Sequence, residues 1–255
     1  MIQPTLLLAT LFSLLGAGVY YYIGRTLASR SVVAPDARLA WLLFIAWWYA
    51  LAGTNLASAA LNLLGAFGVT DLALFLTFTQ IDLLATCVAL FCLVYYLLYL
   101  FTGSRRILAP LIIFYIVFYS LLAYYYNWID PAGVTVGRWE VGLVYQRPQT
   151  GPFFLVVLTL LILPEIIGSL AYFTLFYRVK DATQKYRVAL VSGSILIAFL
   201  SSFMASLAGV AHLDWWQVAS RLIGLAATLA ILMAYQPVRW VKTRWGISSI
   251  GDEGV

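Results

Sequence analysis

The chain has few charged residues. Only 10% of its 255 residues are Asp, Glu, Lys or Arg, and 64% are hydrophobic, with a mean hydropathy of +0.94. A soluble domain carries about 25% charged residues. Because the shortage extends over the whole length, it excludes a soluble protein with a single anchor and predicts an integral membrane protein. The apolar runs are long and continuous, without the alternation of outer-membrane strands, which favours an all-α fold.

Residue types that catalysis or cofactor binding requires are also scarce. The single histidine, His212, excludes paired-histidine haem ligation and a histidine-built zinc site. All three lysines lie at the ends of apolar runs, so a retinal Schiff base in mid-membrane has no lysine to form it. Cys87 and Cys92 are five residues apart in one run and point to different faces. With no Walker, G-x-S-x-G or H-E-x-x-H motif, we expect no enzymatic activity, no cofactor and no metal.

Seven apolar runs predict a single bundle of seven transmembrane helices over residues 1–245, since about 20 apolar residues cross a bilayer. The first run is preceded only by MIQP, so we expect a retained helix rather than a signal peptide. The polar segment 246–255 is predicted to be a disordered cytoplasmic tail. The predicted helices cover about 4–25, 38–65, 70–101, 106–128, 152–178, 186–211 and 214–241.

Positive residues collect on one side of the predicted bundle. Twelve Lys and Arg residues lie in one set of connections, and only Arg138 and Arg147 lie in the other. The positive-inside rule then places the N-terminus outside and the C-terminus in the cytoplasm, across an inner (plasma) membrane. Basic residues at the ends of apolar runs are typical of orientation signals and contacts with membrane lipids. Nucleic acid is therefore not expected as a partner, despite the formal charge of +5.

The connection 129–150 is the only long loop, and it falls on the predicted outer side between the fourth and fifth helices. Its segments VTV and EVGLVY have strand composition and flank GRW, which predicts a short β-hairpin. Such a hairpin either covers the bundle as a lid or is a rigid surface element.

Three ionisable residues lie well inside the predicted spans. Asp82, Glu165 and Arg221 would each be costly facing lipid, so each is expected to face the bundle interior. At about 1.5 Å of rise per residue, the three fall in one layer between the midplane and the outer third of the membrane. Two carboxylates facing one guanidinium leave a negative charge unbalanced. Either a carboxyl is protonated by desolvation, or a cation or ligand supplies the missing charge.

Other polar residues share these helical faces at spacings of three, four or seven residues. They either form an outward-facing polar cavity for a ligand or only join the helices to one another. The predicted ligand-binding residues are Asp82, Glu165, Arg221, Thr79, Thr86, Asn55, Gln217 and Tyr172.

Three segments carry a resemblance in layout: GRTLASRSVVAPDAR in the first inner loop, GSRRILAP before the fourth helix, and QKYRVALVSGSILIAF at the start of the sixth. Over roughly residues 5–245 the chain resembles the seven-helix sensor region at the N-terminus of many bacterial histidine kinases and diguanylate cyclases. Those proteins continue into a cytoplasmic output domain, whereas this chain stops about ten residues after its last predicted helix. In topology alone it also resembles G-protein-coupled receptors.

Three functions follow as expectations. The first is a receptor-like sensor that binds a small molecule or lipid and signals through its last helix or a partner protein at the basic inner loops. The second is a transporter or proton-coupled carrier that uses the intramembrane carboxyls. The third is a structural or accessory subunit of a membrane complex.

Overall fold

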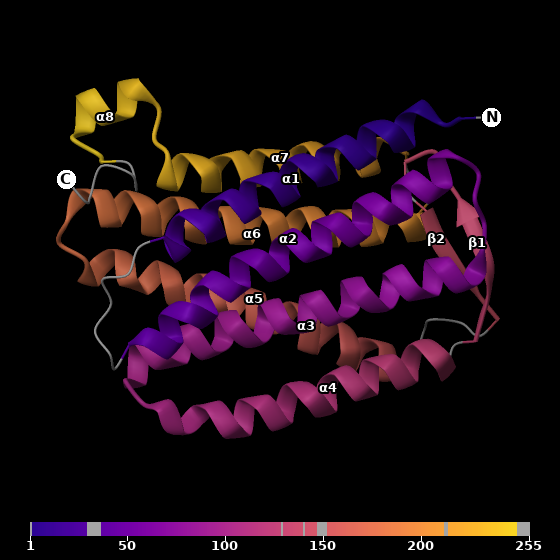
Figure 1. Cartoon of the computed structure of the whole chain (residues 1–255), viewed down its shortest axis with the longest axis horizontal. Helices are drawn as coiled ribbons and strands as arrows, with labels where there is room; N and C mark the ends of the chain where they lie inside the picture. The colour runs from indigo at the N-terminus through magenta and orange to yellow at the C-terminus, as the bar shows by residue number, and fades with distance from the viewer. Residues whose placement is uncertain are drawn as a thin grey trace.

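The structure, a computed structural model, is helical apart from one β-hairpin (Figure 1). It describes residues 2–29, 37–128, 130–139, 141–146, 152–211 and 214–248, with the backbone alone at 126–128, 152–162, 164–165, 199, 202–211, 214–215 and 217. The elements are α1 (Pro4–Ala28), α2 (Arg38–Ala66), α3 (Leu72–Thr102), the 3-10 helix η1 (Arg105–Ile107), α4 (Leu108–Trp128), β1 (Pro131–Val136), β2 (Val141–Tyr145), α5 (Pro152–Arg178), α6 (Ala182–Ala211), α7 (Asp214–Tyr235) and α8 (Arg239–Trp245).

The long helices are of membrane length. Within the described residues, five segments are long and apolar enough to cross a bilayer, and they lie in α1, α2, α3, α4 with η1, and α7. Lipid offers no hydrogen bonds to the backbone, so an apolar segment that crosses it satisfies its N–H and C=O groups within a helix. The prediction of a mostly helical, multi-pass membrane protein is confirmed at this level.

Local side chains set where several helices begin and end. The Asp71 carboxylate accepts a hydrogen bond from the Leu74 N–H at 3.1 Å and caps α3. The Asp181 carboxylate likewise accepts from the Gln184 N–H at 2.7 Å, so α6 begins at 182 rather than at the predicted 186. The prediction that the seventh helix reaches residue 241 is wrong. It ends at Tyr235, because a helix cannot keep its backbone hydrogen bonds through Pro237.

Six helices form a closed ring, and α4 lies outside it. α1 packs against α2 and α7, α6 packs against α7 and α5, and α3 closes the ring between α5 and α2. α4 packs mainly against α3, at the edge of the bundle (Figure 1). The hairpin lies at one end, which we call the hairpin end. The opposite end, where α3 and α5 finish and α4 starts, carries Arg105, Arg106 and Arg178 and is called the arginine-rich end.

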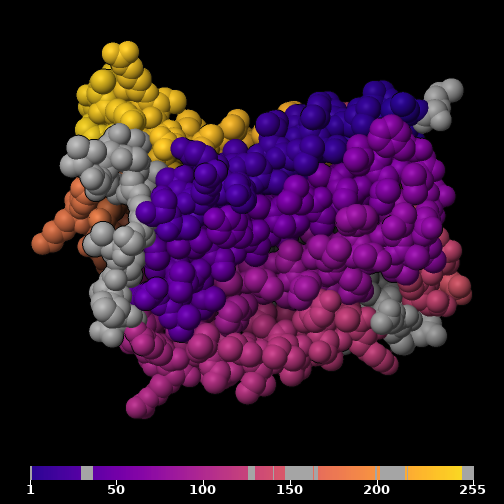
Figure 2. Space-filling view, viewed as in Figure 1, coloured from indigo at the N-terminus to yellow at the C-terminus, as the bar shows by residue number. Residues whose placement is uncertain are grey.

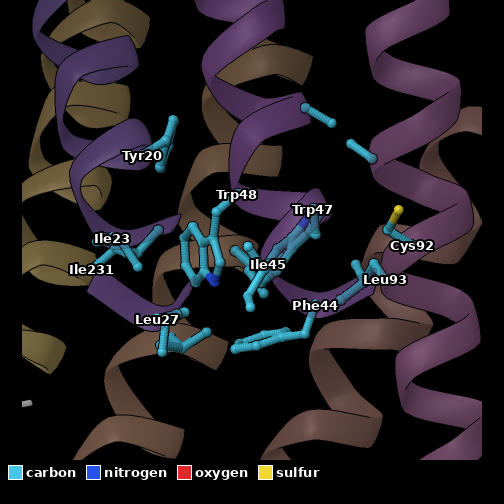
Figure 3. Packing of buried hydrophobic residues seen from close by; sticks show 14 of the residues in the cluster. Tyr20, Ile23, Leu27, Phe44, Ile45, Trp47, Trp48, Cys92, Leu93 and Ile231 are labelled. Atoms are coloured by element: carbon cyan, nitrogen blue, oxygen red, sulfur yellow. The ribbon is translucent and has the colours of Figure 1, made fainter. Parts of the chain in front are cut away.

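Two groups of buried apolar side chains hold the helices together. The small core cluster joins α3 to α4 and consists of Leu83, Cys87, Leu90, Tyr115, Phe118 and Leu122. Cys87 and Cys92 belong to different clusters, as their spacing predicts. The large core cluster joins α1, α2, α3, α6 and α7 and is centred on the aromatic residues of α2 (Figure 3). It consists of Tyr20, Ile23, Leu27, Phe44, Ile45, Trp47, Trp48, Ala50, Ala52, Ala89, Cys92, Leu93, Leu97, Val191, Ile195, Ile231, Ala234 and Tyr235.

The predicted hairpin is present between α4 and α5. β1 and β2 pair antiparallel, with Val134 opposite Leu143. Thr5 of α1 donates a hydrogen bond to the Arg138 carbonyl in the turn of the hairpin. Val141 packs so closely on the last turn of α2 that a Cβ on Gly65 would lie 2.2 Å from its methyl group. The hairpin therefore covers the ends of α1 and α2 and is more than a free surface loop.

α8 stands out from the arginine-rich end of the bundle (Figure 2). Where the sequence predicts a disordered tail from residue 246, the structure packs residues 246–248 onto the bundle. Ile247 is buried, and the Ser248 N–H donates to the Thr183 hydroxyl at 3.4 Å. The rest of the predicted tail, residues 249–255, lies outside the described residues.

Candidate functional site

Asp82 lies about 15 Å along α3 from the hairpin end, counting 1.5 Å per residue from Leu72. It shares a helical face with Ala89, seven residues further on, which belongs to the large core cluster. Its side chain is partly buried, and no hydrogen bond or ion pair joins its carboxylate to another described residue. Asp82 therefore lies on a partly buried face of α3 that continues into the large core cluster.

Arg221 is positioned by the hairpin. Its guanidinium donates to the Trp139 carbonyl, with 3.2 Å between nitrogen and oxygen. No ion pair between described residues joins Arg221 to Asp82. This contact directs the guanidinium toward the hairpin end, so one role of Arg221 is to fix the hairpin over α7.

The side chains of Glu165 and Gln217 lie outside the described residues. The layer that would join Asp82, Glu165 and Arg221 therefore stays a prediction.

The smaller predicted residues on α2 and α3 bond within their own helices. The Asn55 amide donates to the Leu51 carbonyl at 2.9 Å, and a Cβ on Gly16 would lie 2.7 Å from its side-chain oxygen. Asn55 therefore packs against α1. The Thr79 hydroxyl donates to the Phe75 carbonyl at 2.8 Å.

Thr86, seven residues further along α3 from Thr79, is partly buried. For Asn55 and Thr79 the contacts favour a structural role over ligand binding.

Other small polar residues join neighbouring helices. The Ser169 hydroxyl of α5 donates to the Ser192 carbonyl of α6 at 2.7 Å, and the Ser201 hydroxyl of α6 donates to the Ser220 carbonyl of α7 at 2.5 Å. These bonds support the expectation that part of the intramembrane polarity holds the bundle together.

Tyr172 belongs to a polar group near the arginine-rich end. Its ring and that of Tyr96 of α3 pack against the large core cluster, to which Tyr235 of α7 belongs, and Arg187 of α6 lies nearby. We call these four residues the tyrosine–arginine cluster. Arg187 also donates to the Ser248 carbonyl at 3.2 Å, which connects the cluster to residues 246–248. Sequence reasoning found Tyr172 but treated Arg187 only as an orientation signal.

A cavity lies between α3, α4 and α5. It has a volume of about 280 Å³ and is lined by residues within 94–101 of α3, 111–115 of α4 and 163–171 of α5. The lining is almost wholly apolar, and the cavity lies nearer the arginine-rich end than the hairpin end. We call it the α3–α4–α5 cavity. It differs in polarity and position from the predicted polar cavity, and sequence reasoning missed it because its leucines and phenylalanines resemble ordinary lipid-facing residues.

The α3–α4–α5 cavity has a charged rim. The Arg178 guanidinium carbon lies 5.6 Å from the centroid of the Phe101 ring, and Phe101 lines the cavity. Opposite, Gly168 brings α5 close to α3, where an added Cβ would lie 3.1 Å from a Leu97 methyl group. The arrangement suits an apolar guest with a polar or anionic end.

Metal ligands do not gather in the described residues, where no three His, Cys, Asp or Glu side chains come together. The chain matches no protein-family model, no curated protein and no solved structure.

Proposed function

We propose that the chain is a seven-span, receptor-like membrane sensor whose ligand is a lipid or another apolar molecule in the α3–α4–α5 cavity. The observation that carries this proposal is the cavity itself, an apolar space of about 280 Å³ between α3, α4 and α5. Ligand pockets are mostly apolar clefts of roughly 300–1,000 Å³, and this one lies just below that range, which suits part of an acyl chain or a small apolar ligand.

The seven crossings would be the five apolar segments together with α5 and α6, which are 27 and 30 residues long. The basic residues favour the arginine-rich end in the cytoplasm and the hairpin outside. A test uses single cysteines at the exposed positions Thr135 of β1 and Thr243 of α8, since Cys87 and Cys92 are buried. In intact cells an impermeant maleimide should label Thr135→Cys and leave Thr243→Cys unlabelled until the membrane is opened; the reverse pattern would overturn the orientation.

α5 offers a route from the cavity to the tail. Gly168 and Ala171 line the cavity, while Ser169 and Tyr172, one residue further in each case, face α6 and the tyrosine–arginine cluster. A ligand that shifts or rotates α5 would therefore disturb Tyr172, then Arg187 and its bond to residue 248. A partner at the cytoplasmic face would detect that change.

The first test measures binding and response on the full chain in detergent or bilayer discs. The probe is a fatty acid that carries a diazirine on its chain. We expect saturable photolabelling of residues 94–101, 111–115 and 163–171, competed by unlabelled acid and lost in Ala171→Phe, which fills the cavity. An environment-sensitive dye on Ser248→Cys should change its emission when the probe binds, and Tyr172→Phe should weaken that change without preventing labelling.

The alternatives give different results. Labelling spread evenly over all lipid-facing helices would reject a specific site. Labelling without any change at residue 248, in a chain that purifies with a partner at fixed stoichiometry, would favour an accessory subunit.

A proton-coupled transporter is the second candidate, because Asp82 is a partly buried carboxylate without a described partner. Flux into proteoliposomes that depends on a pH gradient and disappears in Asp82→Asn would favour it over the sensor. Saturable binding with no flux would reject it.

A further inference from the structure

The arginines at the ends of α3, α4 and α5 indicate which class of molecule the α3–α4–α5 cavity binds. Arg105 and Arg106 are exposed on η1, between α3 and α4, and Arg178 is the exposed last residue of α5. The three helices that line the cavity therefore carry three positive charges at one end. The inference rests on the proposed ligand site and adds the chemistry of the ligand's head.

The distances from the cavity to these charges are short. Arg106 precedes the lining residue Leu111 by five residues, or about 7.5 Å along a helix, and Arg178 follows the lining residue Ala171 by about 10 Å. The Arg178 guanidinium already lies over the ring of Phe101, which forms part of the cavity wall. An arginine side chain can span the remaining distance, because its apolar stem follows the helix surface while its head stays polar.

Little negative charge opposes them among the described residues nearby. Asp181 lies three residues after Arg178 and its carboxylate caps the start of α6, accepting the Gln184 N–H. No ion pair between described residues joins it to Arg178, so its single negative charge leaves the three arginines in excess. Guanidinium groups bind phosphate through paired, charge-assisted hydrogen bonds and suit it better than an ammonium group does. An apolar cavity with an arginine rim is thus complementary to an amphiphile with an anionic phosphate head.

We propose that the α3–α4–α5 cavity holds one acyl chain of an anionic phospholipid, whose phosphate binds Arg105, Arg106 and Arg178. The cavity volume of about 280 Å³ accommodates part of a chain, and the rest of the lipid stays in the bilayer along α4. A bound lipid would bridge α4 to α5.

The experiment measures lipid retained by the purified full chain. Wild type is equilibrated with equal amounts of phosphatidylglycerol and phosphatidylcholine of identical chains, and the co-purified lipid is quantified by mass spectrometry. We expect phosphatidylglycerol to exceed phosphatidylcholine about tenfold, because both lipids carry the phosphate but the cationic choline of phosphatidylcholine is repelled by the three arginines. Arg105→Gln/Arg106→Gln/Arg178→Gln should bring the ratio close to one.

A matched control removes the same charge from the same end. Arg239→Gln/Lys242→Gln/Arg244→Gln takes three positive charges from α8, which lies across the bundle from α4 (Figure 1). It should leave the ratio within about twofold of wild type, since exposed charges farther than a Debye length are screened. An equal loss in both triple variants would overturn the proposal, because it would show a general surface charge effect.

Ala171→Phe separates this inference from the proposed function. One outcome would overturn the headgroup assignment and keep the cavity as a ligand site. In it, Ala171→Phe releases both lipids, while the triple arginine variant keeps the wild-type ratio of phosphatidylglycerol to phosphatidylcholine. Full retention by a folded Ala171→Phe would overturn both. If that variant does not fold, the wild-type protein is crosslinked with phosphatidylglycerol that carries a photoreactive group on its head. Crosslinks at 105–106 and 178 support the proposal, while crosslinks to α8 or to a second copy of the chain overturn it.

Discussion

The two sides of α3 are packed very differently. On the α2 side, the rings of Phe44 and Tyr96 stack with centroids 4.4 Å apart, and Trp48 is fully buried. On the α4 side, six residues form the small core cluster, and the cavity opens beside it. Much of α4 faces outward, with Ile113 and Ile116 exposed by 63% and 61%.

The difference follows from what lipid does to apolar side chains. Lipid solvates a leucine as well as another leucine does, so no hydrophobic force drives α4 onto α3, and association depends on close packing and hydrogen bonds. Aromatic and small residues provide that packing in the large core cluster. Beside the small core cluster, a space of about 280 Å³ remains between the leucines and phenylalanines that line the cavity. The proposed binding site and the main aromatic packing thus lie on opposite sides of one helix.

The largest expected effect is on the α2 side. Trp48→Ala should lower the free energy of unfolding by about 3 kcal/mol, the low end of the range for truncating a large buried aromatic side chain, since only packing is lost between membrane helices. The loss is one of packing, because the indole N–H of Trp48 has no hydrogen-bond partner among the described residues. Thermal or SDS-induced unfolding of purified protein measures it. Trp240→Ala is the control, since Trp240 is 56% exposed on α8, and a similar loss there would contradict the comparison.

A matched pair of leucines on α4 tests the other side. Leu122 is fully buried in the small core cluster, whereas Leu111 lines the cavity. Leu122→Ala should cost about 2 kcal/mol, the low end of the range for soluble cores because only packing is lost in lipid, and Leu111→Ala about 1 kcal/mol, because a side chain beside an existing space makes fewer contacts to lose. The same unfolding assay compares them. Equal losses would mean that α4 is packed evenly along its length.

The fold could be predicted from sequence further than the site could. Continuous apolar runs, a shortage of charge and strand-like segments around GRW predict the helices and the hairpin, since these patterns follow from the solvent alone. The helix boundaries that were predicted wrongly depend on single residues. Pro237 separates α8 from α7, and Asp181 caps α6 so that it begins early.

Predicting the candidate site from sequence would have required knowing which helices are neighbours. Polarity marked Asp82 and Asn55, yet Asn55 packs against Gly16 of α1, while the cavity is lined by residues indistinguishable from lipid-facing ones. An empty space between three helices leaves no pattern in any one of them. The Arg178 contact with Phe101 joins segments 77 residues apart and is visible only in the fold.

The smallest expected effect concerns the hydrogen bonds that join ring helices away from α3. Ser169→Ala removes the bond to the Ser192 carbonyl between α5 and α6 and should cost about 0.6 kcal/mol, the average for such bonds between membrane helices. Thr77→Ala removes a bond within α3 at an exposed position and serves as the control, with no measurable loss expected. Double variants with Leu122→Ala sharpen the comparison. If the ring and α4 are held independently, the two losses add within about 0.5 kcal/mol, and a larger coupling would show that α4 depends on the α5–α6 contact.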